Sequence, residues 1–364
     1  MGIVLARYAY RLGNGAATLA ALPTAGRIAP VRVNYGGART GDSGGPLVKA
    51  RLLKQHFPET RFGFSLVYLL SNALYLPKPV IAAIRARDIP IVLNQNGVFY
   101  PAWYPHGWEA ENTRMAIAYE GASHVFWQSE FCRRCADRFL GPRRAGGEVL
   151  YNAVDTDRFR PEPTANTSGA FRLLLTGKIG VSTAYRLASS IDVVALARRN
   201  GLNVVLTVAG AIALAVEGEA RAQIDRLGLT GAVTFLGSYG GQQAPEIYRA
   251  ADAYIMTKHN DPCPNVVIEA MAAGLPILYS ASGGVPELVG PSAGVGLPVE
   301  ESFDRVIVPA PLAIAEGLAE LVAKRDDMAT AARTRAVEKF GLEHWISRHG
   351  AVFEQLVKFG SVSS

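Results

Sequence analysis

Cysteine is scarce in this chain, and long hydrophobic runs are absent. The three cysteines, Cys132, Cys135 and Cys263, are too few and too scattered for a disulfide framework. Cys132 and Cys135 have C-x-x-C spacing, but no second Cys or His pair follows at metal-binding spacing, so packing within a helix is the favoured interpretation. No apolar run reaches the roughly 18 residues that a membrane span needs. The sequence therefore predicts neither a disulfide-stabilised fold nor a transmembrane helix.

Acidic residues are sparse in the first part of the chain. Residues 1–151 contain 18 Lys and Arg against 9 Asp and Glu, whereas the remainder contains 19 against 22. The basic half favours an anionic partner such as a lipid phosphate or a membrane face, although charge for general solubility explains it equally well. Residues 1–30 contain no acid, and their small residues are broken by Gly and Pro. We expect them to form a poorly packed N-terminal extension, which could lie upstream of the natural start.

Apolar strands and helices alternate through most of the 364 residues, and 49% of the residues are hydrophobic. This length suggests two domains, each large enough to bury its own core. Strands are expected at 31–35, 61–67, 89–94, 124–128, 148–151, 171–176, 203–209 and 233–236. Helical stretches separate most of them, which predicts an α/β fold with parallel sheets.

The most informative stretch runs from His259 to Leu288. It follows an apolar strand and carries two acids eight residues apart, Asp261 and Glu269, with a helix expected from residue 265 to 273. A strand, a turn with available N–H groups and a helix N-terminus together form an anion site. Carboxylates at the two ends of that helix can accept hydrogen bonds from hydroxyls on either side of the anion. A nucleotide sugar presents this combination, with a sugar, a diphosphate and a ribose.

The letters D-P-C-P-N-V-V-I-E-A-M-A-A-G-L-P, followed by S-G-G-V-P-E-L, resemble the donor signature of family 4 retaining glycosyltransferases, the glycosyl transferases group 1. The family usually has Glu where Asp261 stands and Phe-Gly where Cys263 and Pro264 stand. The resemblance implies the GT-B fold, in which two Rossmann-like domains with parallel sheets face each other across a cleft. It places the acceptor domain at 31–151, a linker at 152–170 and the donor-nucleotide domain at 171–340. A helix in 341–364 would cross back to the first domain.

The resemblance also assigns roles to residues of the second domain. Asp261 would hold the transferred sugar and Glu269 the ribose. The diphosphate would be bound by the amides of Asn265 and Val266 and by two cations, Lys178 and Arg186. Tyr239 lies where the family's base-binding loop is found. Among these, Asp261, Glu269 and Lys178 are the catalytic candidates.

A glycine-rich loop near residue 44 allows two interpretations. Gly41 to Leu47 reads G-D-S-G-G-P-L, the serine signature of chymotrypsin-like proteases. Those enzymes need a His and an Asp ahead of the Ser, but no His precedes Ser43 and the only earlier Asp is Asp42. We therefore reject a peptidase and assign Gly44 and Gly45 to a loop that opens a helix. There the backbone can approach the phosphate of the donor or the acceptor.

The acceptor is expected to contact the loop that follows the strand at 89–94, because ligands of open parallel sheets bind at the carboxyl ends of strands. Asn96 lies in this loop, where many family members have a His. Trp103 and Tyr104 are available to stack on sugar faces, but they could equally be core residues.

The sequence thus predicts a retaining glycosyltransferase that moves a sugar from a nucleotide-diphosphate donor to a glycan or lipid-linked hydroxyl, in surface polysaccharide or glycoconjugate biosynthesis. We expect no metal or other cofactor, no nucleic acid partner, and a cytoplasmic location, with peripheral membrane contact through the basic half. Two alternatives stay open: a GT-B sugar-nucleotide epimerase, and a non-catalytic relative that binds nucleotides or glycans. The sequence does not specify the sugar, the base, the acceptor, the linkage or the oligomeric state.

Overall fold

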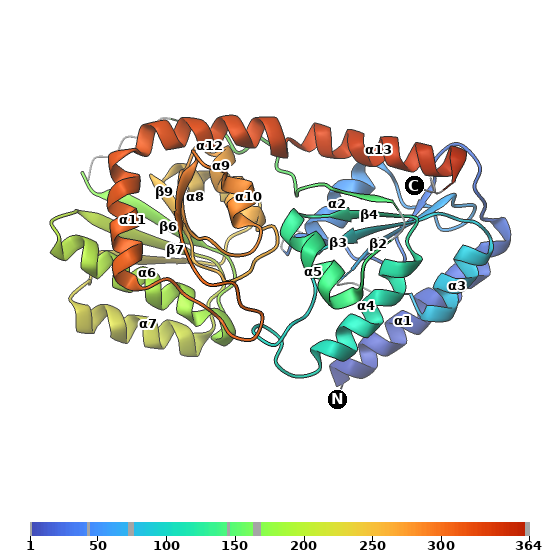
Figure 1. Ribbon diagram of the computed structural model, residues 1–364, viewed down its shortest axis with the longest axis horizontal. Helices are drawn as coiled ribbons and strands as arrows, with labels where there is room; N and C mark the ends of the chain where they lie inside the picture. Colours follow the sequence, from blue (N-terminus) through green and yellow to red (C-terminus); the bar gives the residue numbers. More distant parts are fainter. Residues whose placement is uncertain (1, 42–43, 72–75, 144–145, 163–168, 361–364) are drawn as a thin grey trace. The chain divides into compact units, whose positions relative to one another are not determined.

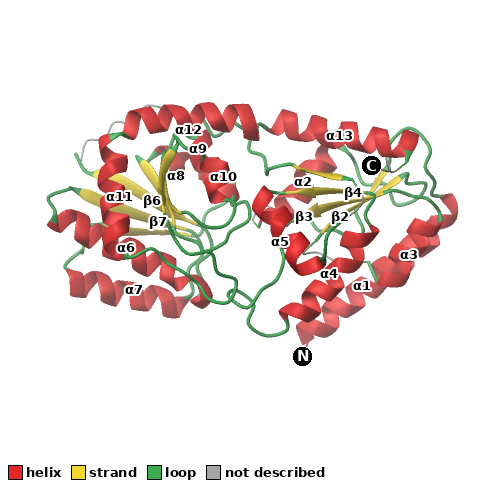
Figure 2. Cartoon of the chain, viewed as in Figure 1, coloured by secondary structure: helices red, strands yellow, loops and turns green. Residues whose placement is uncertain are grey.

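The computed structural model describes residues 2–41, 44–71, 76–143, 146–162 and 169–360. The chain divides into two compact units, the first made of residues 1–151 and 343–364, the second of residues 152–342 (Figure 1). Each unit has a parallel sheet with helices on both faces (Figure 2). The expected α/β class with two parallel sheets is confirmed. Within the described residues, no helix is both long enough and apolar enough to cross a bilayer.

The sheet of the first unit has the strand order β1-β2-β3-β4-β5, and all its pairings are parallel. Its strands are β1 (Val33–Asn34), β2 (Leu66–Leu70), β3 (Ile91–Gln95), β4 (His124–Trp127) and β5 (Gly147–Val149). The helices between them are α2 (Gly45–His56), α3 (Lys78–Ala86), α4 (Trp108–Gly121) and α5 (Glu130–Leu140). Every residue of β2 and β3 is buried, as expected for central strands covered on both faces.

The helix α13 (Leu342–Phe359) completes the core of the first unit. His349 is fully buried on it, and its Nε2 lies 3.1 Å from the hydroxyl of Tyr68 on β2. Phe353 makes an edge contact with Tyr68, and Arg348 forms an ion pair with Glu148 at 2.8 Å. The last helix is therefore an integral part of the first unit.

The N-terminal residues differ from the expectation of a poorly packed extension. They form the helix α1 (Gly2–Ala21), which packs on α3. Gly15 is buried, and a Cβ added to it would lie 2.9 Å from Cδ of Pro77. The hydroxyl of Tyr10 donates to the carbonyl of Gly37 at 2.9 Å. The glycine at position 15 allows this close packing, which the sequence pattern did not predict.

The strand expected at 61–67 is also displaced, because β2 begins only at Leu66. Gly63 has a φ of +66° and forms part of a bend, which an extended strand cannot include. The apolar run after Phe64 supplies the strand instead.

The sheet of the second unit has the order β11-β10-β9-β6-β7-β8, again with parallel pairings. Its strands are β6 (Phe171–Thr176), β7 (Val204–Ala209), β8 (Val233–Gly237), β9 (Ala253–Met256), β10 (Ile277–Ser280) and β11 (Gly294–Leu297). One face is covered by α6 (Ala184–Arg199), α7 (Leu214–Leu227) and α11 (Pro311–Ala323), which share an apolar core with the sheet. The other helices are α8 (Ala244–Arg249), α9 (Asn265–Ala272), α10 (Val285–Val289) and α12 (Arg325–Phe340).

Candidate functional site

The strand order of the second unit creates one point where ligands are expected. From β6 the chain adds β7 and β8 on one side and then returns to place β9 on the other side of β6. The loops after β6 and β9 therefore flank the topological switch point, where doubly wound folds bind ligands at the carboxyl edge of the sheet. Lys178 follows β6, and Lys258 and Asp261 follow β9.

The loop after β6 is held close to the loop after β7. Gly210 has a φ of +134°, and a Cβ added to it would lie 2.1 Å from the carbonyl oxygen of Gly177. Lys178 follows directly and is exposed, and no described carboxylate lies within ion-pair distance of it. The buried Arg186 on α6 donates from Nη2 to the carbonyl of Thr176 at 3.1 Å. The structure thus brings both predicted cations to the end of β6.

Asp261 is held on three sides in the loop after β9. Its Oδ2 accepts from Lys258 Nζ at 2.7 Å, and its Oδ1 accepts from the N–H of Cys263 at 3.2 Å. Its carbonyl accepts from the N–H of Gly284 at 2.9 Å. A Cβ on the neighbouring Gly283 would lie 2.5 Å from that carbonyl oxygen, so the loop requires glycine there. Each carboxylate oxygen has a second lone pair, which leaves Asp261 able to accept from a ligand hydroxyl.

Two neighbours fix the path of this loop. Asn260 has a φ of +50°, and its Nδ2 donates to the carbonyl of Ser302 at 2.8 Å. His259 accepts at Nδ1 from the N–H of Ile307 and donates from Nε2 to the same Ser302 carbonyl. Burial lowers the pKa of His259, which agrees with this neutral tautomer. These contacts position the loop, and we assign no ligand contact to His259 or Asn260.

The N-terminus of α9 lies between the two predicted acids in the sequence. The first N–H groups of a helix have no intrahelical acceptor, and no described loop supplies one to Asn265 or Val266. Asn152 supports this turn, because its Nδ2 donates to the carbonyl of Cys263 at 2.8 Å and to Oδ1 of Asn265 at 2.7 Å. The arrangement leaves backbone donors and the positive end of the helix for an anion.

Glu269 is the fifth residue of the same helix and lies in a group of tyrosines. Its Oε2 accepts from the hydroxyl of Tyr248 at 2.8 Å, and Thr176 Oγ1 lies 3.3 Å and 3.1 Å from the hydroxyls of Tyr248 and Tyr254. Burial raises the pKa of Glu269 and raises the pKa of Tyr239 to about 12. Besides burial, the charge of Glu269 contributes to the raised pKa of Tyr239. Tyr239 and Glu269 therefore lie in the same neighbourhood, and their assignment to one nucleotide stays a prediction.

The predicted residues of the first unit lie at the carboxyl edge of its own sheet or in its loops. Gly44 is exposed, has a φ of +88° and precedes the first turn of α2. Gly45 begins that helix, and Asp42 and Ser43 lie outside the described residues. The side chain of Asn96 is engaged, because its Oδ1 accepts from Lys49 Nζ at 2.6 Å and from Gln128.

The aromatic residues of the predicted acceptor loop are not core residues. The side chain of Trp103 is 49% exposed and that of Tyr104 is 37% exposed. Trp103 stacks on Phe99 with ring centroids 5.0 Å apart and an interplanar angle of 17°. Its Nε1 donates to the carbonyl of Val98 at 3.1 Å. The loop thus presents a preorganised aromatic surface.

Several residues of these sites were not foreseen from the sequence. Lys258 is the most important, since it adds a third cation near the predicted diphosphate site, and its spacing of three residues from Asp261 was the available signal. Tyr248 gave no local signal, and Asn152 was assigned to the linker without a role in the site. Lys49 lies on α2 and is only 4% exposed, which the sequence did not indicate.

Comparison with known proteins agrees with this geometry. Residues 181–336 match the family model described as "Glycosyl transferases group 1". The chain is 30% identical over 236 residues to a Mycobacterium tuberculosis protein named GDP-mannose-dependent alpha-(1-6)-phosphatidylinositol monomannoside mannosyltransferase. That alignment covers 57% of this chain and 54% of the mycobacterial protein, so the chain spans about half the length of this curated relative.

Solved structures show the same fold at lower identity. Sucrose-phosphate synthase from Thermosynechococcus elongatus has a TM-score of 0.65 at 19% identity, covering 82% of this chain and 75% of the other. Anabaena HepE in complex with UDP and glucose has a TM-score of 0.64 at 20% identity, covering 85% and 82%. The fold is therefore GT-B, and residues 181–336 are similar to the glycosyl transferases group 1 family.

Proposed function

We propose that this protein is a retaining glycosyltransferase that transfers a sugar from a nucleotide-diphosphate sugar to a hydroxyl of a glycan or a lipid-linked acceptor. The observation that carries the proposal is the composition of the carboxyl edge in the second unit. Lys178, Lys258 and the N-terminus of α9 gather there around the switch point between β6 and β9. Asp261 and Glu269 lie at the two ends of the same stretch.

The positive groups suit a diphosphate leaving group. The backbone N–H groups of Asn265 and Val266 would donate to phosphate oxygens, and Lys178 and Arg186 would add positive charge from the loop and helix that follow β6. Lys258 lies 2.7 Å from Asp261 and is 39% exposed, so it can approach a phosphate while keeping its carboxylate partner. With this charge in place, we propose that transfer needs no divalent metal.

The proposed reaction takes place on one face of the sugar. The bond between the anomeric carbon and the phosphate oxygen breaks, and its electron pair goes to the diphosphate. The acceptor oxygen bonds to the anomeric carbon from the same face, and its proton passes to the leaving phosphate oxygen. Asp261 would orient the sugar through its hydroxyls, and the cations would stabilise the charge that develops on the diphosphate.

The nucleotide is proposed to bind at Glu269 through the ribose and near Tyr239 through the base. The mycobacterial relative is named as GDP-mannose-dependent, and the HepE structures contain UDP or UDP-glucose. Both bases are therefore worth testing. For the acceptor, we propose the exposed surface of Trp103 and Tyr104, and the basic first unit is compatible with peripheral contact with an anionic membrane.

The test begins with calorimetric titration of GDP, UDP and ADP into the whole chain. Lys178→Gln is expected to raise the Kd of the preferred nucleotide by about tenfold or more, because one charge-assisted contact is lost. Lys339→Gln is the control, since this lysine is exposed on α12 and outside the site. If none of the three nucleotides binds, or if both variants bind them as the unaltered protein does, the proposal fails.

Turnover separates the proposed reaction from its alternatives. Nucleotide release from the sugar donor should require an acceptor hydroxyl and continue in EDTA, and the product should keep the anomeric configuration. A new nucleotide sugar formed from the donor alone would indicate an epimerase. Binding without any turnover across a panel of acceptors would indicate a non-catalytic relative, and activity lost in EDTA and restored by Mg²⁺ would exclude the metal-free mechanism.

A further inference from the structure

The second unit contains a basic cavity at the edge of the sheet opposite the candidate donor site. Its volume is about 500 Å³. Arg172 near the start of β6 and Asp252 just before β9 lie in its wall, and so do Ala273 and Leu275 after α9. The donor loops follow the carboxyl ends of the same two strands. The cavity is therefore separate from the donor site.

The charged side chains of the cavity carry an excess of positive charge. Arginines outnumber carboxylates among the lining residues, which include Arg172, Arg249, Arg325, Arg333, Glu162 and Asp252. Both carboxylate oxygens of Asp252 accept hydrogen bonds from Arg172. The Nε of Arg172 donates to Oδ2 at 3.0 Å, and its Nη2 donates to Oδ1 at 2.7 Å. Although burial opposes it, this pairing lowers the pKa of Asp252, so the carboxylate stays ionised. Glu162 pairs with Arg249 at 3.4 Å.

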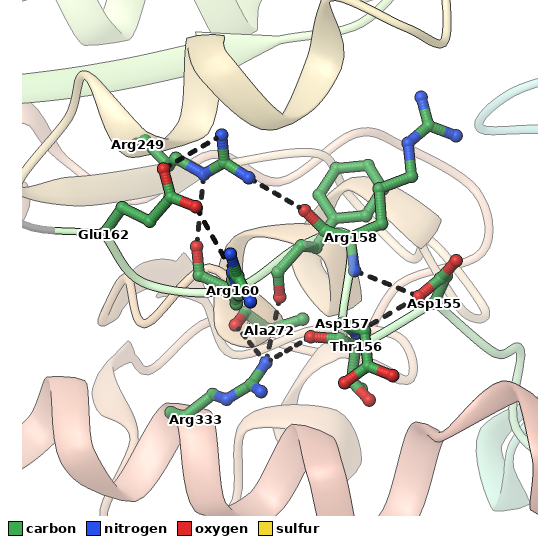
Figure 3. A network of polar contacts seen from close by, with 10 residues as sticks. Asp155, Thr156, Asp157, Arg158, Arg160, Glu162, Arg249, Ala272 and Arg333 are labelled. Carbon is green, nitrogen blue, oxygen red and sulfur yellow. Dashed lines mark hydrogen bonds and ion pairs between the residues drawn. The ribbon is translucent and has the colours of Figure 1, made fainter.

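Two arginines on one face of α12 remain without a buried carboxylate partner among the described residues. Arg333 donates only from Nη1, to the carbonyls of Thr156, Phe159 and Ala272 at 2.8 to 2.9 Å (Figure 3). Arg325 pairs at 2.8 Å with Asp326, whose side chain is 89% exposed, so water screens this pair. The Nε of Arg325 is buried and has no hydrogen-bond partner in the described structure.

The spacing along α12 leaves room between these two arginines. Arg325, Ala329 and Arg333 follow each other at intervals of four residues and therefore share one face of the helix. Ala329 provides only a methyl group between the two long side chains, and Thr330 and Thr334 add hydroxyls to the same wall. Leu275 and Ala251 add apolar surface.

We propose that this cavity binds a phosphomonoester, with Arg325 and Arg333 contacting the dianionic phosphate. Guanidinium groups match phosphate oxygens in geometry and keep their charge at every physiological pH. The four arginines of the lining exceed its two carboxylates by two charges, which matches a dianion. The volume exceeds that of free phosphate and admits a polar body of the size of a hexose, for which the threonine hydroxyls supply partners.

The occupied cavity would also contact the segment that begins the second unit. Arg249 donates to the carbonyls of Arg158 and Arg160, and Arg333 to those of Thr156 and Phe159 (Figure 3). A ligand on Arg333 therefore bonds to a side chain that already fastens residues 156–159. We expect binding to slow amide exchange in this segment.

The test uses the whole chain with inorganic phosphate, glucose 6-phosphate and GMP as probes and uncharged glucose as the blank, measured by calorimetry and by hydrogen exchange. Arg325→Gln removes one guanidinium, whose ion-pair partner is the exposed Asp326. We expect this substitution to raise the Kd of the phosphate compound about tenfold to hundredfold. Ala329→Gln should block the cavity sterically while keeping both charges. Arg221→Gln is the control, because Arg221 forms a similar exposed pair with Glu217 on α7, outside the cavity.

The outcomes separate this cavity from the donor site. If Lys178→Gln abolishes the binding and Arg325→Gln does not, the phosphate compound occupies the donor site and the proposal is wrong. Equal affinity in Arg325→Gln and the unaltered chain also refutes it, as does the absence of binding up to about 10 mM of any probe. Binding of inorganic phosphate as tight as that of glucose 6-phosphate would refute the part of the proposal that assigns a hexose-sized body. Melting temperatures of both variants check that the loss does not come from unfolding.

Discussion

Replacing Glu269 by Gln tests the donor site most directly. The substitution keeps the shape of the side chain, and the amide oxygen can still accept from Tyr248, whose hydroxyl now lies 2.8 Å from Oε2. What disappears is the negative charge that would bind the ribose hydroxyls. We therefore expect weaker binding of the free nucleoside diphosphate and of the sugar donor alike.

The size of the effect follows from the kind of hydrogen bond that is lost. A hydrogen bond to a charged group contributes about 1.5–3 kcal/mol, about twice that of a neutral pair. Losing that charge at the ribose corresponds to an increase in Kd of about tenfold to a little over a hundredfold. The affinity of the unaltered protein should also fall as the pH drops toward the raised pKa of Glu269, because protonation removes the same charge.

Glu269→Gln should lower the nucleotide affinity but should not lower the free energy of unfolding. Burial raises the pKa of Glu269 in the folded protein above its ordinary value of 4.5. Between these two pKa values the folded state binds a proton that the unfolded state has lost, so the free energy of unfolding falls as the pH rises. At neutral pH the buried carboxylate is therefore a cost, and Glu269→Gln should melt at the same temperature as the unaltered protein or higher.

Calorimetric titration of the nucleoside diphosphate and a thermal melt together form the assay. Glu246→Gln, the same change at an exposed position on α8, is the control and should alter neither quantity. Unchanged nucleotide affinity in Glu269→Gln would refute the assignment of the ribose to this carboxylate. A drop of several degrees in Tm would show that the charge is structural.

Three further predictions concern other parts of the chain. Asp261→Asn should bind free nucleotide nearly as well as the unaltered protein but transfer sugar more slowly, and a loss of nucleotide affinity in calorimetry would reverse our assignment of the two acids. Gly13→Ala should raise the free energy of unfolding by about 0.5–1 kcal/mol, because no atom lies within 4 Å of the added Cβ. Gly15→Ala should not be stabilising, because its added Cβ would clash with Pro77. Equal denaturation midpoints of the two variants would contradict the packing of α1. Burial lowers the pKa of His349 to about 3, so the folded first unit should lose stability as the pH falls below 6.5, and His349→Gln should flatten that dependence between pH 6.5 and 4.5 in denaturant titrations.

The sequence predicted most of the strands and helices because their patterns are local. The strand β6 was expected at 171–176 and found at Phe171–Thr176, and the helix α9 was expected from residue 265 to 273 and found at Asn265–Ala272. The helix α1 was missed because it lacks acids in its first turn and an identifiable cap, and its packing depends on the close approach at Gly15. A sequence pattern contains no information on which distant residue such a glycine meets.

The candidate site was predictable in part for the same reason. A strand, a turn and a helix N-terminus are consecutive in the sequence, so Asp261, Asn265 and Glu269 could be selected together. The partners that hold these residues are set by tertiary contacts, as the bond from Tyr248, 21 residues before Glu269, illustrates. Asn96 shows the same limit, since only the structure reveals that Lys49, 47 residues earlier, occupies its side-chain oxygen.

The membership of α13 in the first unit has a consequence for biosynthesis. Residues 152–342 form one continuous unit, so a growing chain can complete that unit as soon as Leu342 has emerged. Most of the first unit is synthesised before it, but His349 and Phe353, which fill its core beside Tyr68, are missing until α13 has been translated. Residues 1–151 must therefore remain incompletely folded, with apolar surface exposed, while residues 152–342 fold. Chaperones on the ribosome would find their substrate in this waiting segment, and a stop codon before α13 would leave a folded second unit attached to an unfinished first one.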